Sequence, residues 1–219
     1  MQFITVNRAV DARPLPRGPH RLTRQEVAAS QRARLMTACT ALLAERGYAG
    51  VTIGELAQRA QVSRATFYEH FDDKETCLLA AYDAFALSLT AAMVTSVAAD
   101  STWSAFIAAT LVGYLGTLED DPAAARAFIV EMDAAGPTAR RRRRDAAHAI
   151  AMFLGERHRT IRATNPPLGF LSDQVWLTLV LGIRELVREA LEEEAEPVLT
   201  DLAPEILSLI FAAVEGAPR

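Results

Sequence analysis

Two T-x-x-E capping boxes divide the first part of this chain into short helices with well-defined starts. They lie at residues 23–26 (TRQE) and 52–55 (TIGE). In such a box the hydroxyl and the carboxylate each bond a free backbone N–H of the first turn, so the box marks where a helix begins. Apolar residues then recur at helical spacing as far as Gly47. The first helix is therefore expected over 24–46.

The second box opens a helix expected over 53–60, and another short helix follows almost at once. Ser63 is a favoured N-cap, and the helix that it starts is expected to run through His70. Two helices of about eight residues joined by such a short turn form a helix-turn-helix pattern. Two aspartates then precede a longer helix that is expected to begin at Lys74.

The rest of the chain is also helical in character. Its periodicity predicts helices at about 103–118, 122–134, 137–159, 173–192 and 204–214. No stretch alternates apolar and polar residues between turn signals as a strand would. We therefore expect an all-α protein of about nine helices. Its parts are expected to be a flexible arm over 1–22, a helix-turn-helix domain over 23–73 and a helical body over 74–219.

The charge of the chain is divided between its two parts. Residues 1–80 carry 11 Lys or Arg against 8 Asp or Glu, whereas residues 81–219 carry 12 against 19. The front part can therefore meet a polyanion, which the acidic body would repel. The only cysteines, Cys39 and Cys77, lack metal-ligand spacing, which predicts no metal site and indicates a reducing cytoplasm. No apolar run of about 18 residues predicts a membrane span.

The side chains around the third helix meet the requirements of a DNA reader. A short helix in the major groove needs small or hydrogen-bonding residues on its leading face and phosphate donors beside it. Arg64 is expected to read bases, whereas Tyr68 and Lys74 are expected to add affinity for any sequence. The expected DNA contacts are Thr52, Ser63, Arg64, Ala65, Thr66, Tyr68, His70 and Lys74. Taken singly, five of them also fit the solvated surface of a short helix: Arg64, Thr66, Tyr68, His70 and Lys74.

These residues resemble the DNA-binding module of the TetR family of bacterial transcriptional regulators. The stretch GYAGVTIGELAQRAQVSRATFYEHFDDKETCLLAAYD (47–83) has that family's Gly-aromatic helix end, Thr cap, Val-Ser turn, Tyr-x-His-Phe segment and following Lys. Gln61 departs from the pattern, which has a glycine before the Val-Ser pair. Because glycine takes a positive φ more readily than glutamine, a turn that is either slightly strained or differently shaped is predicted. Gly54 also departs and is expected to weaken the second helix.

The resemblance implies a homodimeric repressor that binds a palindromic double-stranded operator and is released by a small molecule. It further implies a cytoplasmic, nucleoid-associated protein without a cofactor. In that family the last two helices form the dimer interface, and their broad apolar circumference here agrees with burial on two sides. The expected interface residues are Trp176, Leu179, Val180, Ile183, Val187, Ile206, Leu207, Ile210 and Val214.

A ligand pocket is implied in the body, between the fourth and seventh helices. Its expected lining comes from large side chains on apparent inward faces: Met93, Trp103, Phe106, Tyr114, Met132, His148, Met152 and Trp176. Aromatic and Met side chains at helical spacing are more often plain core, and that interpretation is favoured for each of these residues singly. His148, in an apolar stretch, is favoured as a hydrogen-bonded core histidine.

Three further features leave alternatives open. The five arginines at 140–144 spread around their helix, so we expect most to be solvated or paired, with a second nucleic-acid site or a socket for an anionic ligand as alternatives. Arg17, Arg21 and Arg24 are candidates for minor-groove contacts. Cys77 could sense oxidants only if its thiol were exposed.

The main alternative function is an architectural or constitutive DNA binder without an effector. A ligand-saturable change in DNA affinity would separate the two. An enzyme is not expected, because the chain has no G-x-S-x-G motif, no phosphate-binding glycine loop and no metal-spaced His/Glu pair. A purely structural adaptor would not need the capped short helix that follows Ser63.

Overall fold

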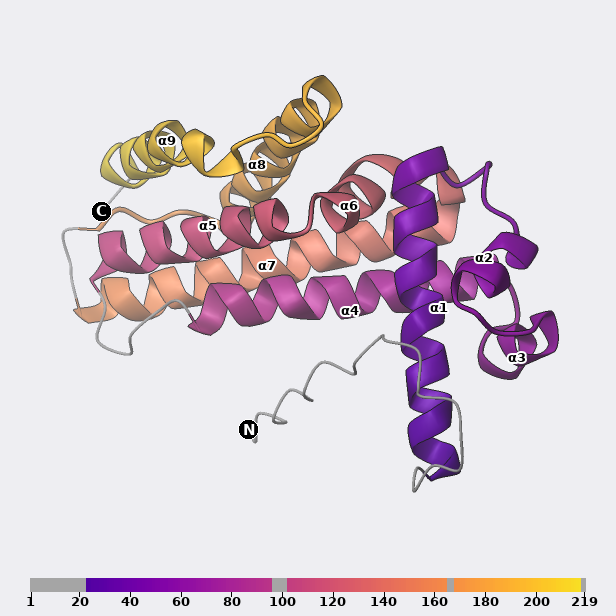
Figure 1. Cartoon of the computed structure of the whole chain (residues 1–219). Coiled ribbons are helices and arrows are strands. Elements are labelled where there is room, and N and C mark those ends of the chain that lie inside the picture. Colours follow the sequence, from indigo (N-terminus) through magenta and orange to yellow (C-terminus); the bar gives the residue numbers. More distant parts are fainter. Residues whose placement is uncertain (1–22, 96–101, 165–167, 218–219) are drawn as a thin grey trace.

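The computed structural model describes residues 23–95, 102–164 and 168–217, and within these ranges all regular structure is helical. The α-helices are α1 (Arg24–Arg46), α2 (Ile53–Arg59), α3 (Arg64–His70), α4 (Lys74–Thr95), α5 (Trp103–Asp120), α6 (Pro122–Ala125), α7 (Pro137–Thr164), α8 (Asp173–Glu193) and α9 (Ala203–Glu215). Figure 1 shows α1, α2 and α3 grouped at one end of a long body, in which α4, α5 and α7 run side by side. The all-α prediction is confirmed.

Both capping boxes form as predicted. In the first, Thr23 Oγ1 accepts a hydrogen bond from the Glu26 N–H at 3.2 Å, and the Thr23 N–H donates to Glu26 Oε2 at 2.7 Å. The second box pairs Thr52 with Glu55 in the same reciprocal way, at 3.3 and 3.0 Å. Helix α1 has the predicted bounds, and α2 ends one residue before the predicted end.

The single helix predicted over 122–134 is instead built from three helical forms. Helix α6 has four residues, and a π-helix, η1 (Arg126–Glu131), and a 3-10 helix, η2 (Met132–Ala135), follow it. The consecutive residues Ala127, Phe128 and Ile129 are all buried, because η1 contacts α1 and α8. Packing on more than one side therefore overrides the α-helical period here.

Helix α4 contributes to both hydrophobic cores of the molecule. Its first turns bring Cys77 into a core with Leu35 of α1 and Phe67 of α3. Its later turns bring Leu89 into the core of the body, and Phe85 packs against both clusters. Among the described helices, α4 alone is long and apolar enough to cross a membrane, by length and composition only. It packs here against α1, α5 and α7.

Neither cysteine has an accessible thiol. Cys39 is buried and Cys77 is fully buried. A hydrogen bond with Cys39, and then burial, raise the pKa of the Cys77 thiol well above its usual range. The exposed thiol that oxidant sensing requires is therefore absent at both positions.

Candidate nucleic-acid interface and internal cavity

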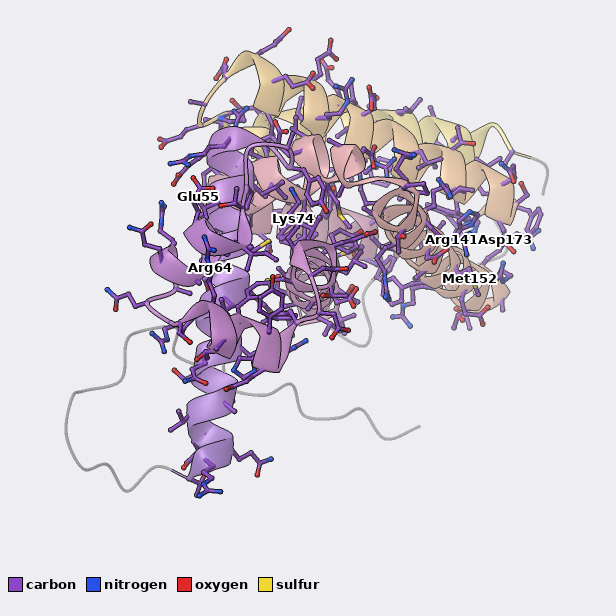
Figure 2. The ribbon with its side chains drawn as sticks, turned by 90° about the vertical axis from the view of Figure 1, so that its right-hand side faces the viewer. Glu55, Arg64, Lys74, Arg141, Met152 and Asp173 are labelled. Carbon is purple, nitrogen blue, oxygen red and sulfur yellow. The ribbon has the colours of Figure 1, made fainter. Side chains whose placement is uncertain are left out.

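Helix α3 is anchored in the core on one side and presented to solvent on the other. Ser63 caps it, and its Oγ accepts from the Thr66 N–H at 2.9 Å. Phe67 is fully buried, whereas Arg64 and Ala65 are exposed. Figure 2 views the molecule from the side on which Arg64 lies. A helix that enters a DNA groove must be presented in this way.

Arg64 folds back over the first turn of α2, where Gly54 leaves room for it. A Cβ at position 54 would overlap the Arg64 guanidinium. The sequence predicts only that Gly54 weakens this short helix. The structure adds a reason for a glycine at this position, because its missing side chain is the space that the arginine occupies.

The turn between α2 and α3 is strained at the predicted residue. Gln61 has a φ of 54°, the only positive φ of a non-glycine residue among the described residues. Its N–H donates to the Gln58 carbonyl at 3.1 Å, and the Val62 N–H donates to the Ala57 carbonyl at 2.9 Å. These two bonds form a Schellman motif, in which glycine usually occupies the position that Gln61 holds.

Replacing Gln61 by glycine is expected to raise the free energy of unfolding by about 1 kcal/mol, because the left-handed conformation costs a side chain roughly that much. Urea unfolding followed by circular dichroism measures the change. Gln58→Gly, in the exposed last turn of α2, is the control and is expected to lower stability by about 1 kcal/mol. A loss of stability in Gln61→Gly would show that the turn is not strained.

Two arginines of α1 bond the ends of the two short helices. The sequence analysis did not predict a role for either of them. Arg34 Nη1 donates to the Ala60 carbonyl at 2.8 Å, and Arg32 Nη1 donates to the His70 carbonyl at 3.0 Å. They thereby bond the C-terminal carbonyls of α2 and α3. The sequence contains one sign of these contacts, because neither arginine has an acidic residue within one helical turn with which it could pair.

Two of the predicted DNA contacts, Thr52 and His70, also bond the module itself. The Thr52 hydroxyl donates to Glu55 Oε2 at 2.8 Å, and His70 Nε2 lies 3.2 Å from Gln31 Oε1. Burial, and then the charge of Arg32, lower the pKa of His70, which keeps it neutral at pH 7. Tyr68 is 57% exposed.

Lys74 ties the start of α4 to the loop between α1 and α2. Its Nζ donates to the carbonyls of Tyr48 and Val51, both at 3.0 Å, and lies 4.1 Å from the centre of the Tyr48 ring. A phosphate contact would use the remaining ammonium hydrogen. The arm over 1–22, with Arg17 and Arg21, lies outside the described residues.

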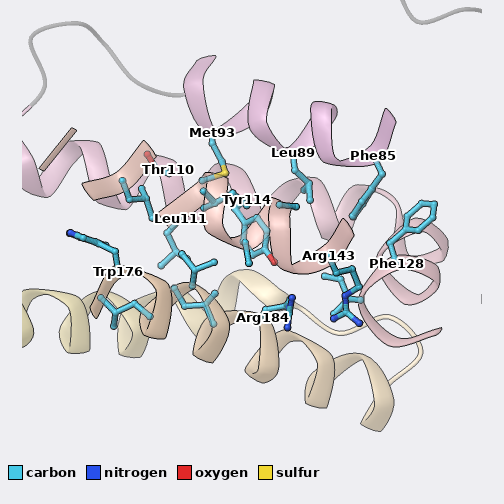
Figure 3. Close-up of a pocket in the computed structure, with 18 of the residues that line it drawn as sticks. Phe85, Leu89, Met93, Thr110, Leu111, Tyr114, Phe128, Arg143, Trp176 and Arg184 are labelled. Atoms are coloured by element: carbon cyan, nitrogen blue, oxygen red, sulfur yellow. The ribbon is translucent and has the colours of Figure 1, made fainter. Parts of the chain in front are cut away.

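An internal cavity of about 90 Å³ lies in the body (Figure 3). Its walls come from α4, α5, α7 and α8, with further residues from η1 and α9, and they are mainly aliphatic and aromatic. Pockets that hold drug-sized ligands have about 300–1,000 Å³. A ligand of that size would therefore have to separate the helices.

The eight side chains expected at a ligand fall into three groups. Three line the cavity: Met93, Tyr114 and Trp176. Three are core residues outside its lining: Trp103, Phe106 and Met132. The expectation of an inward face is wrong for His148 and Met152, because both are exposed. Figure 2 labels Met152 at the surface of the body. Each lies one residue after a buried alanine of α7, so each is turned by about 100° from the inward stripe.

The buried histidine of the body is His158 rather than His148. Its ring is fully buried, with centroid distances of 4.9 Å to Trp103 and 5.4 Å to Trp176. Burial is the largest cause that lowers the pKa of His158. This side chain is part of the aromatic core and does not line the cavity.

The arginine run divides as expected into solvated and paired side chains. Arg141 and Arg144 are exposed, and Arg142 lies 3.6 Å from a carboxylate oxygen of Asp83. Arg143 is buried, pairs with Asp133 at 2.6 Å and also lines the cavity. The sequence contains a sign that Arg143 is buried, because it lies at helical spacing from the alanines at 139, 147 and 151. These alanines form the inward stripe of α7.

Most residues expected at the dimer interface lie inside the single subunit. Five of them are buried there: Trp176, Val187, Ile206, Ile210 and Val214. Three more line the cavity, namely Leu179, Val180 and Ile183, and Leu207 is half-buried. The large exposed apolar side chains of α8 and α9 are Val175, Leu181, Leu186 and Leu209. A helix with two apolar stripes does not reveal in its sequence which stripe faces inward.

Known proteins match this chain first in its N-terminal module. Residues 35–81 match the family of bacterial regulatory proteins called the tetR family. An HTH-type transcriptional repressor of Mycobacterium tuberculosis is 33% identical over 97 residues, which are 44% of this chain and 47% of that protein. The chain therefore spans about half the length of the curated relatives that it matches.

Solved structures match the fold over most of the chain. The fatty acid degradation regulator FadR from Bacillus halodurans has a TM-score of 0.74 at 16% identity, over 82% of this chain and 94% of that one. FadR from Bacillus subtilis, in complex with stearoyl-CoA, has a TM-score of 0.73 at 17% identity, over 83% and 98%. The module at residues 35–81 therefore matches the tetR family of bacterial regulatory proteins, and the chain as a whole shares its fold with the two FadR structures.

Proposed function

We propose that this protein is a repressor that binds a palindromic operator as a homodimer and leaves it when a small molecule enters the body cavity. The observation that carries this proposal is that α4 belongs both to the α1–α3 module and to the wall of the cavity. Its first turns pack in the core of the α1–α3 module, and its later turns line the cavity. One continuous helix therefore links a ligand to the reading helix.

Operator reading is assigned to the exposed face of α3. Arg64 reads a base in the major groove, where a guanidinium can bond guanine in a bidentate way. The flanking contacts to DNA come from Thr52, Ser63, Ala65, Thr66, Tyr68, His70 and Lys74. In support, α3 is short, capped and anchored by a fully buried Phe67, which leaves its outer face free.

The release step follows from the contacts of α4. Phe85, Leu89 and Met93 line the cavity, and Lys74 at the other end bonds the loop before α2. A ligand larger than the present cavity must displace α4, because side chains fill the remaining space. Displacement of α4 moves Lys74 and with it the α2–α3 pair.

Dimerisation is assigned to the outer faces of α8 and α9, which lie on the same side of the body (Figure 1). Exposed apolar residues there include Leu186 and Leu209. A Cβ built at Gly182 meets no atom within 4 Å, so a partner helix can approach closely at that point. A two-fold four-helix bundle would bury these side chains and set the spacing of the two reading helices.

An effector-binding, non-catalytic role in the cytoplasm fits the known relatives. The Bacillus subtilis structure of this fold holds stearoyl-CoA, which supports a body of this shape as a ligand holder. The curated relatives are named as transcriptional regulators.

Selection of bound sequences from a random duplex library by the purified full chain tests the DNA-binding half of the proposal. A palindrome with half-sites about one helical turn apart is expected, because a two-fold dimer presents two equivalent reading helices. Recovery of no preferred sequence would instead support an architectural DNA binder. If the palindrome is recovered but no ligand weakens its binding, the protein is a constitutive binder without an effector.

A further inference from the structure

One end of the cavity carries two positive charges. Arg143 of α7 and Arg184 of α8 both line it, and Figure 3 shows them together at the end away from Trp176. The remaining walls are mostly apolar, with Leu89, Met93 and their neighbours. A charge held among apolar side chains is unfavourable unless a partner of opposite charge is present.

Only one of these two arginines is paired among the described residues. Arg143 Nη1 lies 2.6 Å from Asp133 Oδ2. Arg184 makes no hydrogen bond or ion pair with any described residue, and its Nε is buried without a partner. The adjacent Glu185 bonds Arg188 instead, through both of its carboxylate oxygens. The arginine end of the cavity therefore has an excess positive charge.

The pKa shifts of Arg184 and Tyr114 agree with an excess positive charge at this end of the cavity. Burial, and next the charge of Arg143, lower the pKa of Arg184, whereas Asp133, Tyr114 and Tyr82 act in the opposite direction. The guanidinium is nevertheless charged at neutral pH. Burial raises the pKa of Tyr114 to about 12, so its hydroxyl keeps its proton. Figure 3 shows this hydroxyl directed toward the arginine end, where it can donate to an anion.

We infer that the effector is an amphipathic carboxylate, with one anionic group on an apolar body. Arg184 binds the carboxylate, with Arg143 and the Tyr114 hydroxyl beside it. The apolar body then extends along Leu89 and Met93 of α4, the helix that must move. This inference rests on the proposed function, because it names the ligand class for the same cavity.

A simpler role for Arg184 makes a different prediction. A long arginine side chain can cover apolar surface with its methylene groups while its head reaches water. In that role Arg184 would not distinguish a charged ligand from a neutral one of the same shape. Arg188, one turn further along α8, provides a matched control, because it is held by Glu185 and Glu192 outside the cavity.

Calorimetric titration of the full chain with octanoate and with octan-1-ol compares two ligands that have the same apolar chain. Octanoate is expected to bind at least about tenfold more tightly, since a charge-assisted contact to arginine is among the strongest hydrogen bonds. Arg184→Met is expected to abolish this preference while octan-1-ol still binds. Arg188→Met is expected to keep the preference. Thermal unfolding of both variants checks that they fold.

Several outcomes would overturn the inference. These are equal binding of the acid and the alcohol, an unchanged preference in Arg184→Met, or no binding by hexanoate, octanoate or dodecanoate. Tight binding of octanoyl-CoA alone, dependent on Arg184, would assign the arginines to phosphate instead of carboxylate. Operator binding is measured separately without ligand. If the unaltered protein shows no preference for the acid but a ligand still weakens its operator binding, only the ligand class is wrong. If octanoate binds through Arg184 but no operator is recovered, only the proposed function is wrong.

Discussion

Replacement of Arg64 by alanine is expected to remove most of the discrimination between the operator and unrelated DNA. Arg64 is the first residue of α3, and its side chain is exposed. A bidentate base contact contributes about 1–3 kcal/mol of discrimination, and a palindrome contains two of them. The selected operator should therefore lose about 2–6 kcal/mol of binding free energy, roughly 30-fold to 10⁴-fold in affinity. Unrelated duplex should lose much less.

Fluorescence anisotropy with the selected operator and a scrambled duplex, at one fixed salt concentration, measures both losses. Arg59→Ala is the matched control, because Arg59 is an exposed arginine of α2 that pairs with Glu45 at 2.5 Å. It should leave the ratio of the two affinities unchanged. An equal loss on both duplexes in Arg64→Ala would assign Arg64 to a phosphate.

Gly54→Ala tests whether the position of the Arg64 side chain matters for DNA reading, because this variant moves the side chain but retains the arginine. The new Cβ would displace the guanidinium, while alanine stabilises the short α2 helix by about 0.5–1 kcal/mol relative to glycine. We expect a more stable protein whose selected sequence differs at the base pair that Arg64 reads. An unchanged selected sequence would mean that the contact over Gly54 has no role in reading.

The second large effect is expected from Leu186→Glu. Leu186 is 44% exposed on the face of α8 assigned to the dimer. A buried, unpaired carboxylate on each side of a two-fold interface would be strongly unfavourable. The variant should be monomeric in sedimentation analysis. Loss of linkage between two half-site contacts should then reduce operator affinity by roughly 10²–10⁴-fold.

Leu87→Glu is the control for this experiment. Leu87 is 64% exposed on α4, which lies on the other side of the body from α9 (Figure 1). The same charge there should leave the oligomeric state and operator binding unchanged. If Leu186→Glu remains dimeric, the interface lies elsewhere on the molecule.

Features that depend on neighbouring residues were predictable from the sequence. The starts of α1 and α2 depend on hydrogen bonds between residues three positions apart, and both were predicted correctly. The strain at Gln61 likewise follows from one residue in one turn, and its φ of 54° agrees with the prediction. Such contacts are visible in sequence because both partners lie in the same short stretch.

Features that depend on how helices pack were predicted less well. His148 and Met152 lie in apolar stretches, but each is one position away from the inward stripe of α7 and therefore faces the surface. Arg143 belongs to a run in which no single member was predicted to be buried, yet its spacing from the buried alanines of α7 brings it inward. Which stripe of a helix is buried depends on its neighbours, and those neighbours come from distant segments of the chain.

Because α4 contributes to two cores, the stability of one is tied to that of the other. Loss of α4 structure would expose Leu35 and Phe67 of the first core together with residues of the second. The reading module and the body should therefore unfold in one cooperative step rather than as two independent domains. Protection of amide hydrogens in α3 against exchange would then report on occupancy of a cavity that α3 does not touch.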